Sequence, residues 1–178
     1  MPRMVYKLVL LKLSGEVLGV QGRGIDQKKI KQVVLEIKAA KKLGVKIAIV
    51  VGGGNWWRKR EGDKQLSAIT SDYMGMIGTV LNGLALADYL NKAGVKTELQ
   101  SYLVSAPGIN KVSAKKARLS LQQGKVVIFA GGTGKPMVTT DTAAALRARD
   151  IKAQAIFKVG LTDAVYSADP DKNKHAKR

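Results

Sequence analysis

Short runs of aliphatic and β-branched residues alternate along this chain with stretches of helical periodicity, and no other feature constrains the fold more strongly. The apolar runs cover residues 5–11, 46–51, 97–104, 125–130 and 154–159. The helical stretches begin after Asp26 and continue over 71–93, 113–123 and 141–149. Runs of this length, bounded by glycine or polar residues, predict buried strands. The alternation predicts an α/β fold in which a mostly parallel sheet has helices on both faces, an αβα sandwich.

Local signals mark the ends of the first helix. Asp26 is a suitable N-cap, and apolar residues recur at helical spacing from Ile30 to Ala40. Gly44 follows and should end the helix before the next strand.

Four glycine-containing segments follow or approach the predicted strand ends. They are KLSGE at 12–16, GGGN at 52–55, GGTGKP at 131–136 and KVGLTDAVY at 158–166. Ligands of parallel α/β sheets bind outside the carboxyl ends of the strands, so these segments should share one edge. Because glycine has no Cβ, its backbone amide can approach an anion closely, and a following helix N-terminus adds partial positive charge. Each segment alone is also compatible with an ordinary turn, but together they predict one phosphate-lined cleft.

Two charged residues are candidates for chemistry at that edge. Lys12 ends an apolar run, where it would supply a positive charge to a transferring phosphoryl group or extend from the sheet edge into solvent. Asp141, in TTDTAAALRA, would orient Lys12 or would cap a helix. Neither GxxxxGK[ST] nor GxGxxG occurs, so the usual P-loop and dinucleotide-binding motifs are missing.

The composition excludes several classes of site. The 178 residues fit one domain spanning 1–178, with a polar tail at 171–178. The chain has no cysteine, and its one histidine, His175, lies in that tail, so cysteine chemistry, histidine chemistry and a dedicated protein metal site are not expected. No apolar run approaches the roughly 18 to 20 residues that span a bilayer, and we expect a cytoplasmic protein without a membrane partner.

The net charge of +18, from 31 basic and 13 acidic residues, predicts attraction to polyanions or to phosphate-bearing ligands. A nucleic-acid-binding protein usually concentrates this charge on one strip, whereas the lysines here are spread along the chain. A basic solvated surface is therefore favoured, and nucleic-acid binding remains an alternative.

A set of motifs in fixed order resembles the bacterial UMP kinases of the amino-acid kinase superfamily. The motifs are LLKLSGE, VVGGGN with Arg58 beyond it, DYMGM at 72–76, LNGLAL at 81–86, TGKPMVTTDTAA at 133–144 and DAVYSADP at 163–170. The resemblance covers about Val5 to Pro170. It implies transfer of the γ-phosphoryl group of ATP to UMP, with Mg²⁺, in pyrimidine nucleotide synthesis, usually by a homohexamer.

The resemblance also implies roles for individual residues. Lys12 and Asp141 would be catalytic, and segment 22–25, GRGI, falls where many members bind a GTP effector. The implied ATP-binding residues are Lys12, Leu13, Ser14, Gly15, Gly54, Arg58, Gly160, Tyr166 and Asp169. The implied UMP-binding residues are Gly53, Asp72, Thr133, Gly134, Lys135, Pro136, Met137, Val138, Thr139 and Thr140.

Elementary chemistry is compatible with this activity. A phosphate monoester with a second pKa of about 6 is already a competent nucleophile at neutral pH, so no general base is needed. The protein must supply positioning and charge neutralisation, which suits lysine, arginine and exposed glycine amides. Trp56 and Trp57, beside GGGN, are expected to pack or to face a neighbouring subunit rather than to stack on a base.

Several departures from the family pattern keep two alternatives open. Lys135 replaces a usual asparagine, Met137 and Val138 replace an aromatic pair, and segment 158–166 lacks a threonine and a lysine of the family. The family also continues beyond the ADP sequence at 168–170, so the C-terminal part of its fold is expected to be absent. One alternative is a truncated, non-catalytic nucleotide- or RNA-binding remnant. The other is a related kinase acting on a carboxylate or carbamate.

Overall fold

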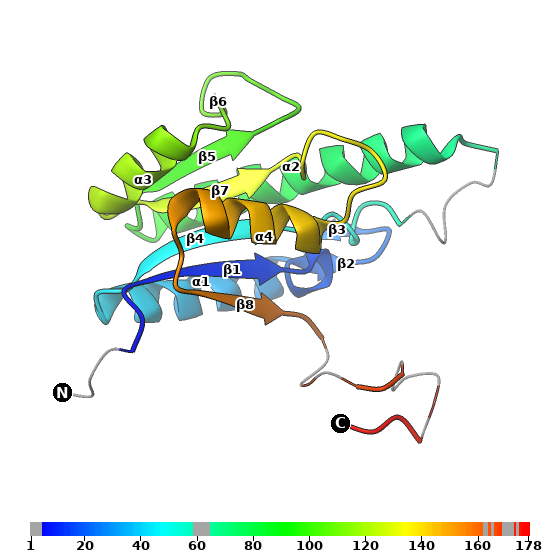
Figure 1. The fold of residues 1–178 in the computed structure, drawn as a ribbon, viewed down its shortest axis with the longest axis horizontal. Helices are drawn as coiled ribbons and strands as arrows, with labels where there is room; N and C mark the ends of the chain where they lie inside the picture. The colour runs from blue at the N-terminus through cyan, green and yellow to red at the C-terminus, as the bar shows by residue number, and fades with distance from the viewer. Residues whose placement is uncertain (1–4, 59–64, 162–163, 165, 169–172, 174) are drawn as a thin grey trace.

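The computed structural model describes residues 5–58, 65–161, 164, 166–168, 173 and 175–178. Six strands form one sheet in the order β6-β5-β7-β4-β1-β8, and all five neighbouring pairs are parallel (Figure 1). The strands are β1 Leu8–Leu13, β4 Lys46–Val51, β5 Thr97–Ser101, β6 Asn110–Lys111, β7 Val126–Ala130 and β8 Ala155–Val159. The five predicted strands and their parallel arrangement are confirmed, whereas the two-residue strand β6 was not predicted.

Four α-helices lie between the strands, and side chains cap their N-termini as the sequence signals require. The helices are α1 Gln27–Lys42, α2 Ala68–Lys92, α3 Ala114–Gln122 and α4 Thr140–Ile151. Asp26 accepts hydrogen bonds from the backbone N–H groups of Lys28 and Lys29, as predicted. In α4 the N-cap is Thr139, which accepts from Thr142 N. The capping alternative for Asp141 was therefore wrong, and its carboxylate is available to other groups.

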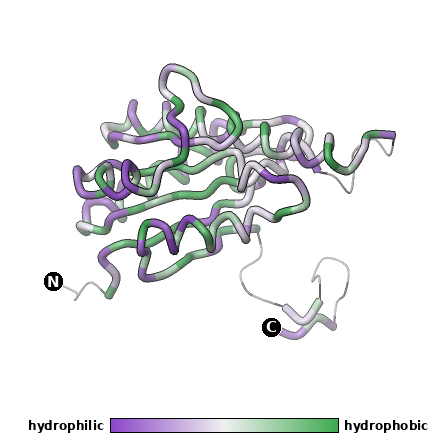
Figure 2. Tube along the Cα trace, turned by 45° about the horizontal axis from the view of Figure 1, so that its top comes forward, coloured by the Kyte–Doolittle hydropathy of each residue, from purple (hydrophilic) through white to green (hydrophobic). Residues whose placement is uncertain are grey.

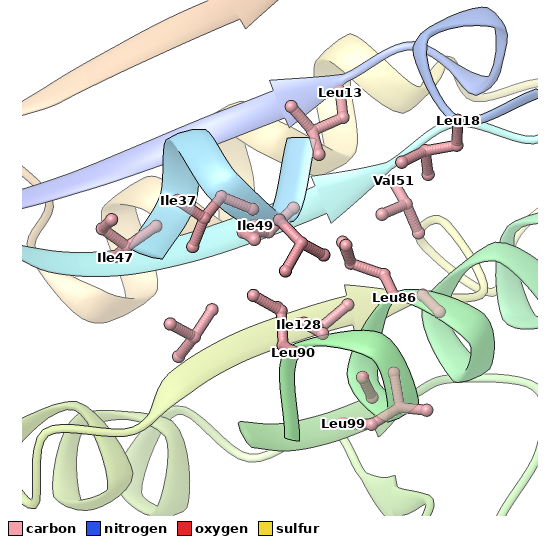
Figure 3. Packing of buried hydrophobic residues seen from close by; sticks show 14 of the residues in the cluster. Leu13, Leu18, Ile37, Ile47, Ile49, Val51, Leu86, Leu90, Leu99 and Ile128 are labelled. Carbon is pink, nitrogen blue, oxygen red and sulfur yellow. The ribbon is translucent and has the colours of Figure 1, made fainter. Parts of the chain in front are cut away.

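Side chains alternate between the two faces of the sheet, and helices cover both faces of its central strands β4 and β7. One face, with Leu13, Ile49, Val51 and Ile128, packs against α1 and α2 (Figure 3). The other face packs Leu10, Ala48, Val50, Val127 and Phe129 against small and aliphatic residues of α3 and α4. Figure 1 shows α4 in front of the sheet and α1 behind it. The αβα sandwich is confirmed.

Hydropathy follows this layering. Figure 2 shows hydrophobic residues along the central strands, while hydrophilic and hydrophobic residues alternate along the helices. None of the helices in the described part of the chain combines the length and apolar character that a membrane crossing requires.

Between β1 and α1 the chain forms the short helix η1 Gly15–Val17 and a small antiparallel hairpin, β2 Gly19–Val20 and β3 Gly24–Ile25. This hairpin was not predicted, because strands of two residues are too short to show a periodic pattern in the sequence. The carboxyl ends of β1, β4, β7 and β8 lie at the same edge of the sheet and lead into the glycine-containing segments.

Candidate functional site

The first two glycine segments meet at the carboxyl edge of β1 and β4. Gly52 N donates to Leu13 O at 2.7 Å, and Ser14 N donates to Val159 O at 2.9 Å, which joins the ends of three strands. A Cβ on Gly15 would lie 2.5 Å from Asn55 Oδ1 and 2.7 Å from Gly54 N. Only glycine therefore permits this approach of two backbones.

A pair of buried asparagines fixes the GGGN loop to α2. Asn55 Nδ2 donates to Asn82 Oδ1 at 3.0 Å, and Asn82 Nδ2 donates to Asn55 Oδ1 at 2.7 Å. Asn82 also donates to Gly52 O at 2.6 Å and accepts from Trp56 Nε1 at 2.8 Å. Both amides are fully buried. This pair was not predicted, although the polar Asn82 within the apolar LNGLAL segment could have indicated it.

Lys12 and Asp141 form an ion pair at this edge, and Asp141 also binds Lys158, which was not predicted as a site residue. Lys12 Nζ lies 2.9 Å from Asp141 Oδ1, and Lys158 Nζ lies 3.0 Å from Asp141 Oδ2. Lys12 and Lys158 are register partners in β1 and β8. Burial acts to raise the pKa of Asp141, but the two ammonium groups outweigh it and hold that pKa below its usual value. A charged carboxylate thus holds two cations that a phosphate could also bind.

Arg58 lies beside the same edge in an ion pair with Glu16. A Cβ on Gly54 would lie 2.5 Å from Glu16 Oε1 and 3.3 Å from Arg58 Nε, so the loop backbone passes directly against the pair. Burial acts to raise the pKa of Glu16, but the hydrogen bond from Arg58, smaller hydrogen-bond contributions and the positive charge of Arg58 together outweigh it, so the pKa lies below its usual value. Glu16 was not predicted, and it is a group with which a phosphate would compete for Arg58.

Ser14 and Leu13 occupy different environments although they are adjacent. Ser14 Oγ is buried and has no hydrogen-bond partner within the described ranges, while it lies close enough to Glu16 to favour the charged carboxylate. A buried hydroxyl without a partner can donate to a ligand oxygen. The side chain of Leu13 packs into the core between the sheet and α1, so only its backbone faces this edge. The predicted contact of Leu13 with ATP would therefore have to come from its backbone.

A hollow of about 200 Å³ opens between the GGGN loop, the start of α2 and the segment before α4. Seven predicted site residues line it, namely Gly53, Gly54, Asp72, Lys135, Val138, Thr139 and Thr140. It is completed by Trp57, Ser71, Gly75, Met76, Thr79 and Gly132. These six were not assigned, although Gly75 and Met76 lie in the DYMGM motif. The hollow combines one carboxylate, one ammonium group and several hydroxyls with an aromatic ring, which suits a small polar ligand.

Two contacts hold the walls of the hollow. Met137 N donates to Asp72 Oδ2 at 2.8 Å and ties the segment before α4 to α2. Trp57 Nε1 donates to Ser71 Oγ at 2.8 Å. Trp56 packs instead against the hairpin, where a Cβ on Gly24 would lie 2.4 Å from its ring. Both tryptophans were expected to pack or to face a neighbouring subunit. Trp56 does pack against the hairpin, whereas Trp57 lines the hollow.

The remaining predicted acceptor residues lie beside the hollow. Thr133 Oγ1 accepts from Lys135 N at 3.3 Å, and Gly134, with φ of 74°, lies against Tyr102. Met137 is 71% exposed and has φ of 63°. Pro136 belongs to the same segment and is half-buried. These four shape the segment, and their side chains are not among the groups that line the hollow in the described chain.

The residues expected near the nucleoside part of ATP are less fully described. Gly160 follows β8 and is exposed, and Tyr166 is half-buried, whereas Asp169 lies outside the described residues. Segment 22–25 forms the turn and second strand of the hairpin, and Gly22 N donates to Asn55 O at 2.9 Å. The segment expected to bind an effector is therefore bonded directly to the GGGN loop.

The described residues contain no group of three side chains of the His, Cys, Asp or Glu type that could hold a metal ion. Mg²⁺ usually keeps several waters and is bound by one or two carboxylates together with substrate phosphates. Asp141 is a carboxylate at this edge, and its two oxygens contact lysines. The donor set fits a metal carried by a nucleotide rather than one held in a protein cage.

Residues 7–178 match the model of the amino acid kinase family. The chain is 46% identical to the uridylate kinase of Brucella anthropi, over 97% of this chain and 73% of that protein. The UMP kinase structures from Bacillus anthracis and Ureaplasma parvum superpose with TM-scores of 0.89 and 0.87, each at 32% identity. These superpositions cover 97% and 98% of this chain and 72% and 75% of the other chains. The uridylate kinase of Archaeoglobus fulgidus is more distant, with a TM-score of 0.67 at 29% identity over 96% of this chain and 71% of the other.

Proposed function

The chain belongs to the amino acid kinase family, and on this premise we propose that it transfers the γ-phosphoryl group of ATP to UMP, giving ADP and UDP. Its relatives named above are uridylate or UMP kinases. They give no support to a non-catalytic remnant. The observation that carries the proposal is the position of Asp141, which directly follows Thr140 of the hollow and binds Lys12 and Lys158 at once.

In the proposed reaction, the protein positions two anions and neutralises their charge. An oxygen of the UMP phosphate attacks the γ-phosphorus of ATP, and the bond from that phosphorus to the β,γ-bridging oxygen breaks as ADP leaves. The UMP phosphate is largely ionised at neutral pH, so no residue has to remove a proton. Lys12 and Lys158 would balance the charge on the transferring group, while Asp141 fixes their positions. Mg²⁺ bound to the ATP phosphates would supply further charge neutralisation.

The hollow is the proposed acceptor site. Asp72 can accept hydrogen bonds from ribose hydroxyls, and Thr139 and Thr140 can donate to the base or phosphate. Lys135 adds a positive charge that an asparagine would not supply. The glycine amides of the GGGN loop, between this hollow and Lys12, would bind phosphate oxygens of both substrates.

The donor site is proposed at the opposite side of the GGGN loop. Ser14 and Gly15 would contact ATP phosphates, and Arg58 would exchange its Glu16 partner for phosphate. Gly160, Tyr166 and Asp169 would bind the nucleoside part of ATP. The pair of ATP and UMP implies a cytoplasmic role in pyrimidine nucleotide synthesis.

We also propose that the chain forms a homo-oligomer through α2. One face of this helix exposes Ile69, Tyr73, Ile77, Leu81 and Leu84. These residues recur three or four positions apart and so form one apolar stripe. An apolar stripe of this kind is typical of a protein interface. A hexamer and a GTP effector at segment 22–25 remain predictions, checked by light scattering and by assays with GTP.

The substrate proposal is tested with a panel of acceptors. Purified protein with Mg-ATP should convert UMP to UDP at least about tenfold faster than CMP, AMP or GMP, since one well-placed polar contact is sufficient for that ratio. N-acetylglutamate, aspartate and carbamate should give no ADP above background. If the protein instead phosphorylates a carboxylate or carbamate in preference to UMP, the UMP kinase proposal is wrong and the protein is a different kinase of the same family.

A further inference from the structure

A buried arginine of α4 is bonded to a tyrosine at the end of β5. The side chain of Arg147 is only 7% exposed, and its Nη1 donates to the hydroxyl of Tyr102 at 2.6 Å. The guanidinium carbon lies 4.9 Å from the centroid of the Tyr102 ring. Asp150 completes the arrangement, because its Oδ2 lies 3.0 Å from Arg147 Nη2. The ring and the hydroxyl of Tyr102 are thus both held by a group fixed in the body of α4.

The other side of Tyr102 supports the segment that precedes α4. A Cβ on Gly134 would lie 3.0 Å from Tyr102 Cβ and 3.4 Å from its Cγ. A Cβ on Gly131 would lie 2.8 Å from Ser101 Oγ and 3.1 Å from Tyr102 N. Both glycines have positive φ, at 74° each. The 131–134 turn therefore lies directly against the end of β5, in a conformation that other residues adopt at a cost.

The two ends of this connection belong to the two halves of the proposed site. The segment 131–140 supplies Gly132, Lys135 and Thr139 to the acceptor hollow. The helix that carries Arg147 also carries Asp141, which binds Lys12. Neither Tyr102 nor Arg147 lines the hollow as described, so any effect of these residues on catalysis has to act through position.

We propose that Tyr102 and Arg147 are positioning residues that hold the acceptor segment in register with Asp141 and Lys12. The proposal rests on the proposed UMP kinase function. Arg147 Nε is buried without a hydrogen-bond partner in the parts of the chain that are described, so the Tyr102 hydroxyl is one of few partners of this guanidinium. Tyr102 itself is 46% exposed, and burial alone therefore does not require a tyrosine there.

A purely structural role is the competing explanation, in which Arg147 and Asp150 only stabilise α4. Steady-state kinetics separate the two, because loss of register affects the acceptor more than the donor, whereas general instability affects both substrates alike. The variants are Tyr102→Phe, which removes the hydroxyl, and Tyr102→Ala, which also removes the ring. Arg147→Lys keeps a donor for Tyr102, and Arg147→Met does not. Tyr89→Phe, a half-buried tyrosine of α2, is the matched control.

We expect KM for UMP to rise about threefold in Tyr102→Phe and about tenfold or more in Tyr102→Ala, with KM for ATP within about twofold of wild type. Arg147→Lys should lie closer to wild type than Arg147→Met, and Tyr89→Phe should be unchanged. An unchanged KM for UMP in Tyr102→Ala, or equal rises for both substrates, would overturn the proposal.

Amide hydrogen exchange over residues 131–138 gives a readout that does not depend on activity. The Tyr102 variants should exchange faster in this segment, while Tyr89→Phe should match wild type. If wild type makes no UDP, the proposed function fails, and the exchange result alone then decides whether the Tyr102–Arg147 contact positions this segment. Unchanged exchange would reject it even if wild type is an active kinase.

Discussion

Lys12 of β1 and Lys158 of β8 are register partners in adjacent parallel strands, and the carboxylate of Asp141 lies between their ammonium groups. Their environments differ, since the side chain of Lys12 is 12% exposed and that of Lys158 is 68% exposed. A charge in a drier environment interacts more strongly with a developing charge. We therefore expect Lys12 to stabilise the transition state of phosphoryl transfer more than Lys158 does.

Lys158→Met should lower kcat by about tenfold, less than Lys12→Met, for which about a hundredfold loss or more is expected. The matched control is Lys31→Met, an exposed lysine on α1. Initial rates at saturating ATP and UMP check the order. Equal rates for Lys158→Met and wild type would show that Lys158 only pairs with Asp141 and does not assist transfer.

The Glu16–Arg58 ion pair predicts a pH dependence of stability. Burial opposes ionisation, yet the hydrogen bond and charge of Arg58, together with smaller hydrogen-bond contributions, keep the pKa of Glu16 below its usual value. A depressed carboxyl pKa stabilises the fold at pH above the ordinary value of about 4, and that contribution is lost as the pH falls through the folded-state pKa. Glu16→Gln should therefore cost about 1–2 kcal/mol of the free energy of unfolding at pH 7 and progressively less as the pH falls below about 4.

Urea unfolding of wild type and Glu16→Gln at several pH values measures this difference. Glu36→Gln, on the exposed face of α1, is the control. A difference that stays constant from pH 7 to about pH 3 would contradict a role for the ionised carboxylate.

How far the sequence determined the fold depends on how local each signal is. Asp26 caps backbone N–H groups two and three residues away, and Gly44 ends the helix through its own positive φ. Both signals are local, so the limits of α1 could be predicted from the sequence alone. The Asn55–Asn82 pair joins residues 27 positions apart, and the Tyr102–Arg147 bond spans 45. No local pattern encodes such contacts, because they depend on how α2 and α4 pack on the sheet.

The candidate site was predictable to a similar extent. Strand ends and glycines located the edge and pointed to Lys12 and Asp141, for which the family resemblance implied catalytic roles. The role of Lys158 was missed because it depends on the pairing of β8 with β1. These strands are far apart in the sequence, so no local pattern indicates that they are neighbours. The residue roles in ligand binding remain predictions, whereas the family and the fold are confirmed.

Asn82→Ala should be strongly destabilising, by about 2–4 kcal/mol, because it leaves the Asn55 amide and the Gly52 carbonyl buried with fewer partners. Trp56 Nε1 would lose its acceptor as well. Urea unfolding measures the loss, and the tryptophan emission should shift. Gln122→Ala, at the exposed end of α3, is the control. A loss no larger than in the control would contradict the inferred lock on the GGGN loop.

Gly75→Ala should separate stability from activity. A Cβ at Gly75 would meet no atom within 4 Å, and the position is inside α2, so alanine should stabilise the helix by about 0.5–1 kcal/mol. Gly75 also lines the hollow, so the added methyl group should raise KM for UMP and leave KM for ATP unchanged. Gly78→Ala, whose Cβ would lie 3.0 Å from Trp56 Cβ, is the destabilised comparison. An unchanged KM for UMP would argue that the acceptor binds elsewhere.

The rate of UDP formation by wild type, Lys12→Met, Asp141→Asn and Lys31→Met most directly tests whether phosphoryl transfer occurs at the carboxyl edge of the sheet. Chromatography of the nucleotides after incubation with Mg-ATP and UMP measures all four. We expect wild type and Lys31→Met to be equally active, and Lys12→Met and Asp141→Asn to lose about a hundredfold or more while remaining folded by circular dichroism. Near-wild-type UDP formation by folded Lys12→Met or Asp141→Asn, or none by folded wild type, would contradict the account.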